Sequence, residues 1–173
     1  TVLDGLQALS VFAMRDSLPT ISLAMGAPGV VSRILAPRYG AYLTFASLPQ
    51  PGQETAPGQL SLETMRHTYR ASDMTGETAV VGFVTHAPTQ HTACARLTQE
   101  LLALGFDALV VPLDPTGIAC ASLKRACMAL GFRGMIIRRD AGPESSHVGA
   151  LLRNDRGNWH TLSANAPLRL LLE

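Results

Sequence analysis

The feature that most constrains the fold is an alternation of short apolar runs and helical patterns along the second half of the chain. Three near-continuous apolar runs predict strands at 79–84, 108–113 and 134–138. Such runs are typical of strands that are covered on both faces of a sheet. Two helical patterns separate the strands, at 93–104 and 118–130, and a glycine ends each helix. The resulting βαβαβ order indicates a parallel sheet in an α/β fold.

The first half of the chain also alternates between strand and helix patterns, but with longer connections. Helices are predicted at 4–14, 30–35 and 61–70, strands at 20–25 and 41–46, and a loop rich in proline and glycine at 49–58. Two further short strands, joined by a hairpin turn at 154–157, are predicted at 149–153 and 158–162. Residues 71–78 are small and polar. We therefore predict one domain over 1–72, a linker over 73–78 and a second domain over 79–173.

The single lysine, Lys124, restricts the chemistry of the chain. The other 13 of the 14 basic residues are arginines, so any mechanism that needs a lysine nucleophile has one candidate here. The net charge of +1 provides no field for nucleic acid or for an anionic membrane surface, so neither is expected as a partner. Apolar runs are too short to span a bilayer, and no signal peptide is visible. These patterns favour a cytoplasmic protein.

Three cysteines are present, Cys94, Cys120 and Cys127, and they form no CxxC motif. Cys120 and Cys127 are seven residues apart, which places them two turns apart on one helix face, too far for a disulfide. We interpret all three as buried, reduced thiols. His86 and His91 lie near Cys94 in a predicted loop, but their spacing does not match a zinc site, so no metal is expected.

A connected series of motifs between residues 20 and 61 identifies the first domain more closely. The motifs are ISLAMG at 21–26, SR at 32–33, YLTFA at 42–46 and TAPGQLS at 55–61. Their order and spacing resemble the C-terminal part of type I 3-dehydroquinate dehydratase, a (β/α)8 barrel enzyme of the shikimate pathway. The resemblance implies that this domain is the C-terminal portion of such a barrel.

The resemblance also implies a substrate-binding set for 3-dehydroquinate. Arg33 matches the position that binds the substrate carboxylate, and its planar fork of donors suits that group. Thr55 and Gln59 lie on the loop that the family folds over the substrate, where they face its hydroxyls. The family usually has serine at the position of Thr55. Met25 and Phe45 follow strands and would form apolar walls for the carbocyclic ring. No cofactor is implied.

The family catalyses its reaction through a Schiff base between a lysine and the substrate ketone, with a histidine that moves protons. Both residues belong to strands that come before the matched region, so we expect no catalytic residue on this chain. Lys124 lies in the other domain, and His67, on the helix after the loop, is expected at the surface. A complete barrel needs about 200 residues or more. The remainder is therefore expected from the same polypeptide or from another chain, and the sequence leaves homodimer formation open.

The second domain resembles the substrate-binding, N-terminal domain of shikimate dehydrogenase. The resemblance is mainly one of architecture, because the functional positions differ. A Ser-x-Ser pair is replaced by residues near His91, the lysine after the third strand is absent from IIRRDAGPES at 136–145, and the asparagine after Gly-Ala is Leu151. No GxGxxG motif is present. We therefore expect this domain to be degenerate and without dehydrogenase activity.

Two functions remain open at this point. In the first, the chain is part of a 3-dehydroquinate dehydratase, a lyase, fused to a degenerate shikimate dehydrogenase-like domain. In the second, the chain is a pseudoenzyme, namely a non-enzymatic sensor, regulator or scaffold derived from domains of the shikimate or quinate pathways. The overall fold expected is α/β, with a C-terminal portion of a (β/α)8 barrel followed by a βαβαβ parallel-sheet domain.

Overall fold

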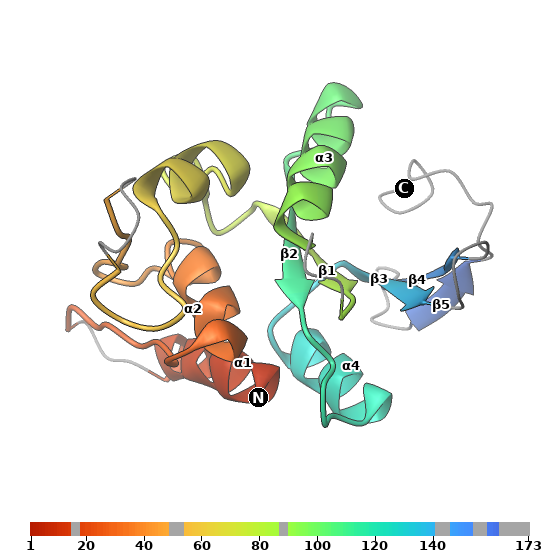
Figure 1. The fold of residues 1–173 in the computed structure, drawn as a ribbon, viewed down its shortest axis with the longest axis horizontal. Helices are drawn as coiled ribbons and strands as arrows, with labels where there is room; N and C mark the ends of the chain where they lie inside the picture. The colour runs from red at the N-terminus through yellow and green to blue at the C-terminus, as the bar shows by residue number, and fades with distance from the viewer. Residues whose placement is uncertain (15–17, 49–53, 87–89, 141–145, 154–158, 163–173) are drawn as a thin grey trace. The chain divides into compact units, whose positions relative to one another are not determined.

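A computed structural model of the chain describes residues 1–14, 18–48, 54–86, 90–140, 146–153 and 159–162, with side chains up to residue 138. The chain divides into two compact units (Figure 1). Unit 1 contains residues 1–78 and 116–130, and unit 2 contains residues 79–115 and 131–173. The linker and domain limits predicted above stay a prediction.

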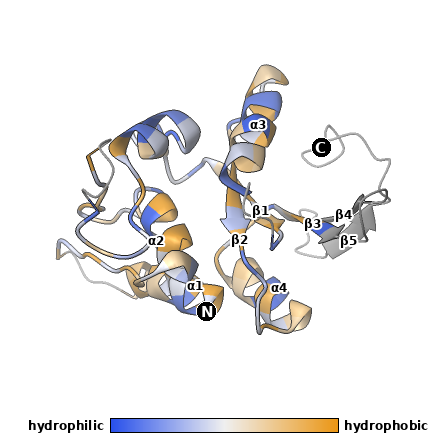
Figure 2. Ribbon diagram, viewed as in Figure 1, coloured by the Kyte–Doolittle hydropathy of each residue, from blue (hydrophilic) through white to orange (hydrophobic). Residues whose placement is uncertain are grey.

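Unit 1 is built around packed helices. Its helical elements are α1 (Val2–Ser10), a 3₁₀ turn (Val11–Ala13), a second 3₁₀ turn (Ala27–Gly29), α2 (Val30–Leu35), a π-helix (Thr64–Thr68) and α4 (Cys120–Ala129). α1 contacts both α2 and α4. Hydrophobic residues alternate with hydrophilic ones along α1 and α2 (Figure 2), and the hydrophobic ones are buried, with Leu9, Ile34 and Leu35 at 0% exposure. Apolar residues at helical spacing thus form the core, as the sequence predicts.

The two strands predicted in the first half of the chain do not form as regular strands. Residues 20–25 and 41–46 have no strand ladder, and one backbone hydrogen bond joins them, from Tyr42 N–H to Thr20 O at 2.9 Å. Strand pairing in this region is limited to a parallel bridge between Ser47 and Ser61. A strand requires repeated hydrogen bonds to a neighbour. The predicted strands are wrong as regular elements because, in the part of the chain that the structure describes, neither has a neighbour that supplies such a ladder.

The helix predicted at 61–70 forms, but with a different winding. Ser61 lies at its start, where Ser61 Oγ accepts a hydrogen bond from Thr64 N–H at 3.1 Å. From Thr64 to Thr68 the helix is a π-helix rather than an α-helix. Tyr69 N–H donates to Thr64 O, five residues earlier, which is the hydrogen bond of a π-helix. The helix ends before Arg70, which has φ +51°.

The turn that follows α2 holds two distant parts of unit 1. Arg38 Nε donates to Thr78 O at 2.8 Å, and its guanidinium lies 5.1 Å from the centroid of the Tyr39 ring. Tyr39 OH donates to Leu130 O, just after α4, at 2.6 Å. Burial raises the pKa of Tyr39 to about 12, and the nearby charge of Arg38 opposes that shift. The neighbouring residues Arg38 and Tyr39 are thus hydrogen-bonded to the end of segment 71–78 and to the residue after α4, respectively.

Alkaline titration tests the environment of the half-buried Tyr39. The folded-state pKa of Tyr39 is about 12, above the ordinary value of 10.0. Its contribution to stability is therefore complete below pH 10 and is lost as the pH rises from 10 through 12. The difference between the phenolate absorbance curves of the wild-type chain and Tyr39→Phe should show one group with a pKa of about 12. A difference curve centred near 10 would contradict the burial of Tyr39 and its bond to Leu130.

Unit 2 contains a five-stranded mixed sheet with the order β2-β1-β3-β4-β5. Its strands are β1 (Ala79–Val84), β2 (Ala108–Leu113), β3 (Gly134–Asp140), β4 (Ser146–Arg153) and β5 (Trp159–Leu162). β1 is parallel to both β2 and β3, whereas β4 is antiparallel to β3 and to β5. The three-stranded parallel sheet and the later hairpin confirm the α/β pattern read from the sequence. The predicted turn at 154–157 lies outside the described residues.

Helix α3 (Gln90–Ala103) packs against the edge of this sheet that is formed by β2. All residues of β2 are buried. Thr98 Oγ1, on α3, accepts a hydrogen bond from Val110 N–H at 3.0 Å. This bond satisfies one donor on the edge of β2, where Pro112 supplies none. α3 corresponds to the helix predicted at 93–104, but it begins earlier, at Gln90. His91 consequently lies in its first turn rather than in a loop.

The prediction that all three cysteines are buried is wrong for Cys120. Cys94 and Cys127 are buried, and burial raises the pKa of each thiol to about 12. Cys120 is exposed because it is the first residue of α4 and lies at the helix end rather than on the packed face. All three are free thiols. Within the described ranges, no helix is long and apolar enough to cross a membrane.

Candidate substrate-binding site

A cavity of about 220 Å³ in unit 1 brings together all five residues that the sequence predicts for substrate binding. Its lining residues are Leu23, Met25, Arg33, Phe45, Thr55, Ala56 and Gln59. They come from three separate stretches of the chain, namely the 20–25 segment, α2 with the segment after it, and the loop before Ser61. The roles of these residues remain a prediction, but the geometry places them on one cavity.

Arg33 is the charged group of this cavity, and it is buried with a side chain that is 1% exposed. Its Nη2 lies 3.5 Å from Met25 Sδ, a weak acceptor. Its Nε has no hydrogen-bond partner, and no carboxylate pairs with the guanidinium among the described residues. Burial lowers the pKa of Arg33 because low-dielectric surroundings disfavour the charged guanidinium. A buried cation in this state is suited to an anionic ligand, which would compensate the lost hydration.

Close backbone packing brings α2 to the cavity. A Cβ atom on Gly29 would overlap Ala24 O, so only glycine allows the start of α2 to approach the 20–25 segment this closely. Ser32 then joins the two, because its Oγ donates to Gly29 O at 2.6 Å and accepts from Ala24 N–H at 2.9 Å. Ser32 is completely buried. The sequence analysis did not assign Ser32 a role, although its place directly before Arg33 in the SR motif could have indicated one.

The loop that contains Thr55 and Gln59 closes one side of the cavity through backbone contacts. Gly26 N–H donates to Pro57 O at 3.0 Å. Gly58 has φ +76°, and a Cβ atom there would overlap Gly26 O. Within the loop, Gln59 Oε1 accepts hydrogen bonds from Thr55 N–H at 2.8 Å and from Thr55 Oγ1 at 3.1 Å. The amide oxygen of Gln59 therefore shapes the loop, and its NH₂ group is the donor available to a ligand.

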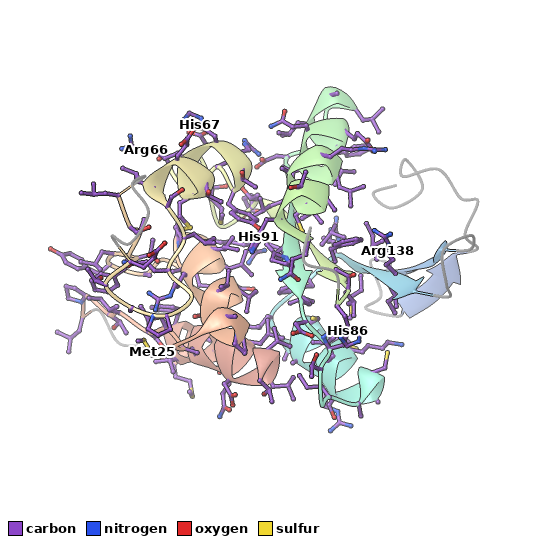
Figure 3. The ribbon with its side chains drawn as sticks, in the orientation of Figure 1. Met25, Arg66, His67, His86, His91 and Arg138 are labelled. Atoms are coloured by element: carbon purple, nitrogen blue, oxygen red, sulfur yellow. The ribbon has the colours of Figure 1, made fainter. Side chains whose placement is uncertain are left out.

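Apolar side chains form the remaining walls. Met25 and Phe45 lie on the open side of the cavity, with exposed fractions of 59% and 46%. Met25, labelled in Figure 3, contacts Arg33 of α2 through its Sδ. Leu23 lines the cavity beside them and was missed by the sequence analysis. The alternation along the 20–25 segment was the available signal, because Leu23 and Met25 are two residues apart and share one face.

The lining residues provide binding groups but no proton-transfer group that titrates near neutral pH. A guanidinium can hold a carboxylate, apolar walls can hold a carbocyclic ring, and a hydroxyl with an amide can bind hydroxyls. His67 was expected at the surface, and it is exposed on the π-helix (Thr64–Thr68), where Figure 3 shows it and Arg66 directed away from α2. The cavity as described is therefore suited to hold a small hydroxylated carboxylate.

In unit 2, polar side chains lie after the parallel strands. His86 follows β1, and its Nδ1 lies 3.4 Å from Asp114 Oδ1, which follows β2. His91 is half-buried on α3, and burial lowers its pKa. The sequence analysis did not assign Asp114 a role. Among the described residues, no group of three or more His, Cys, Asp or Glu side chains is arranged to hold a metal ion.

Comparison with known proteins gives the family of the first segment. The sequence model of type I 3-dehydroquinase matches residues 2–75, which include the whole set that lines the cavity. Residues 2–75 are a partial type I 3-dehydroquinase domain. We call residues 2–75 the dehydroquinase segment. The chain is 36% identical over 78 residues to the bifunctional 3-dehydroquinate dehydratase/shikimate dehydrogenase of Arabidopsis thaliana, and 35% identical over 75 residues to the 3-dehydroquinate dehydratase of Dehalococcoides mccartyi.

The dehydroquinase segment covers only part of each relative. The two matches cover 45% and 43% of this chain but 13% of the plant protein and 33% of the bacterial protein. The chain therefore spans a third or less of the length of these relatives. Among solved structures, the dehydroquinate dehydratase and shikimate dehydrogenase from S. pombe AroM matches 94% of this chain and 33% of that one, with 17% identity and a TM-score of 0.33.

Proposed function

We propose that the dehydroquinase segment forms the substrate-binding part of a 3-dehydroquinate dehydratase active site. The observation that supports this most is Arg33, a buried arginine without an anionic partner among the described residues, on a cavity with apolar walls and a polar loop. 3-Dehydroquinate carries a carboxylate, a carbocyclic ring and hydroxyls. The cavity offers one matching group for each of these features.

In this proposal each lining residue has one task. Arg33 binds the substrate carboxylate through its guanidinium fork. Met25 and Phe45 contact the faces of the ring. Thr55 and Gln59 bind the hydroxyls from the loop, which is held on the Gly26 backbone. The reaction is the syn elimination of water, and its Schiff-base lysine and proton-transferring histidine come from residues outside this chain.

The apolar surface of unit 1 supports the proposal that further barrel strands pack against this segment. Ten large hydrophobic side chains between residues 11 and 62 are at least 39% exposed, namely Val11, Met14, Leu18, Ile21, Met25, Tyr42, Leu43, Phe45, Leu48 and Leu62. Several of them belong to the 20–25 and 41–46 segments, which are extended without a strand ladder. Exposed apolar side chains mark a surface for another protein element where they gather on one face. We propose that the occupant is the remainder of the dehydratase barrel, from the same or another polypeptide.

Borohydride trapping tests the proposed reaction. Sodium borohydride with 3-dehydroquinate should reduce the Schiff base in the complete polypeptide and leave a covalent adduct, detected by intact mass. The isolated 173-residue chain should give no adduct, because its single lysine, Lys124, is not among the residues that line the cavity. Absence of an adduct on the complete polypeptide would contradict the dehydratase proposal, and an adduct on the isolated chain would contradict the assignment of the lysine.

A second candidate function is binding without catalysis, by a degenerate shikimate dehydrogenase-like domain in residues 79–173. One observation favours it: β3 carries Arg138 near its carboxyl end, whereas the chain's lysine, Lys124, lies on α4. An arginine cannot replace a lysine in proton transfer, because it stays protonated. Calorimetric titration with quinate and shikimate tests this function. The chain used carries Arg33→Met, so that carboxylate binding in the cavity of unit 1 does not contribute to the heat. Heat of binding would support a sensor domain, and its absence with both ligands would exclude that role.

A further inference from the structure

The backbone carbonyl of Arg33 lacks its regular helical partner. In an α-helix, the carbonyl of residue 33 accepts a hydrogen bond from the N–H of residue 37. Residue 37 is Pro37, which has no N–H. The carbonyl of Arg33, the most important cavity residue, is therefore not held by the usual helical bond at that position.

Thr44 supplies the missing donor. Thr44 Oγ1 donates to Arg33 O at 3.0 Å, across a separation of 11 residues. Thr44 directly precedes Phe45, which forms an apolar wall of the same cavity. We propose that Thr44 is a positioning residue: it fixes the backbone of Arg33 relative to Phe45, and so sets the distance between the group that binds the carboxylate and the wall that contacts the ring.

The side chain of Arg33 makes this backbone bond important. Its side-chain hydrogen bond among the described residues is the weak one from Nη2 to Met25 Sδ at 3.5 Å, and its Nε has no hydrogen-bond partner there. Because so few hydrogen bonds orient this side chain, its position depends on the packing around it and on where its backbone is held. Ser32, the residue before Arg33, is hydrogen-bonded to the 20–25 segment, and Thr44 joins Arg33 itself to the 41–46 segment. The backbone of the SR motif is thereby held from both neighbouring segments.

The test compares Thr44→Val, which removes the hydroxyl and keeps the shape, with Thr44→Ser, which keeps the hydroxyl. It rests on the proposed function, because its probe is 3-dehydroquinate, titrated by NMR into the complete polypeptide that the borohydride test uses. Thr44→Val should weaken binding about five- to tenfold, and Thr44→Ser should stay within about twofold of the wild type. Thr20→Val is the matched control, since Thr20 Oγ1 also donates to a backbone carbonyl at 3.0 Å, that of Leu18, away from Arg33.

A second readout separates this inference from the proposed function. Hydrogen exchange of the Arg33 Nε–H group, followed by ¹⁵N NMR, should become faster in Thr44→Val and remain at the wild-type rate in Thr44→Ser and Thr20→Val. Unchanged exchange in Thr44→Val would overturn the positioning role, whatever the ligand does. If the complete wild-type polypeptide shows no binding of 3-dehydroquinate while exchange responds as expected, the proposed function fails and the positioning role stands. If the wild type binds, equal affinity of Thr44→Val and wild type would overturn the positioning role.

Discussion

Replacing Arg33 with methionine should weaken the binding of 3-dehydroquinate by about 100-fold, because two charge-assisted hydrogen bonds to the carboxylate are lost. The same substitution should leave the unliganded chain as stable as before or more stable. Arg33 is 1% exposed, its Nε is unsatisfied, and burial lowers its pKa, so its charge is held at a cost in free energy. Methionine fills a similar volume without that charge.

The size of the stability change follows from the buried donor. An unsatisfied buried polar group costs roughly 1–3 kcal/mol, so the free energy of unfolding should rise by about 1–2 kcal/mol in Arg33→Met. Urea denaturation followed by circular dichroism measures it. Arg33→Lys should give an intermediate affinity, since it keeps a charge and loses the planar fork. This opposition between binding and stability is expected of a residue retained for a ligand.

Arg38→Met is the matched control for Arg33→Met, because both arginines lie in one short stretch of unit 1. Arg38 is satisfied by Thr78 O and contacts the Tyr39 ring, so its loss should lower the free energy of unfolding and leave ligand binding unchanged. The reverse outcome, in which Arg33→Met destabilises the chain and binds 3-dehydroquinate normally, would show that Arg33 has a structural role only.

Replacing Gly58 with alanine should detach the Thr55–Gln59 loop from the rest of the cavity. Gly58 has φ +76°, and a Cβ atom would overlap Gly26 O. The left-handed backbone conformation costs alanine about 1–2 kcal/mol, and the overlap adds about 1–3 kcal/mol. Undocking relieves both costs by breaking the bond from Gly26 N–H to Pro57 O. Exchange of the Gly26 amide should accelerate by at least about tenfold, and 3-dehydroquinate binding should weaken as Thr55 and Gln59 move away.

Gly117→Ala separates the two costs. Gly117 has a similar φ of +71°, but a Cβ atom there meets nothing within 4 Å. This variant should lose only the roughly 1–2 kcal/mol of backbone strain and should keep the wild-type exchange rate at Gly26. If Gly58→Ala and Gly117→Ala behave alike in Gly26 exchange and in ligand binding, the loop is not held by the contact between Gly58 and Gly26.

Local patterns allowed much of the fold to be predicted. β1 and β2 form over the predicted residues because apolar runs bounded by helix patterns have few alternatives. The five cavity residues could be predicted because a series of motifs identifies positions without knowledge of the fold. In the structure these five residues line one cavity. Leu23 was within reach of the same reasoning, through its alternation with Met25.

Other features depend on contacts between residues far apart in the sequence. Residues 20–25 and 41–46 have the sequence pattern of strands. A hydrogen-bonded ladder also needs a neighbouring strand, and the sequence of the segment itself does not show whether one is present. Thr44 is separated by 11 residues from the carbonyl that it satisfies, and Pro37 was the one local sign that this carbonyl needed a donor. α4 belongs by its contacts to unit 1, although its sequence lies between two strands of unit 2.

The most direct test of the account is an NMR titration of the Arg33 Nε–H resonance with 3-dehydroquinate and with an otherwise identical compound in which hydrogen replaces the carboxylate. We expect a saturable shift of this resonance with 3-dehydroquinate, a much smaller response to the compound without the carboxylate, and no response at the Nε–H group of Arg38 with either ligand. Equal responses of Arg33 to both compounds, or no response to either, would contradict the claim that Arg33 is held in the cavity to bind a substrate carboxylate.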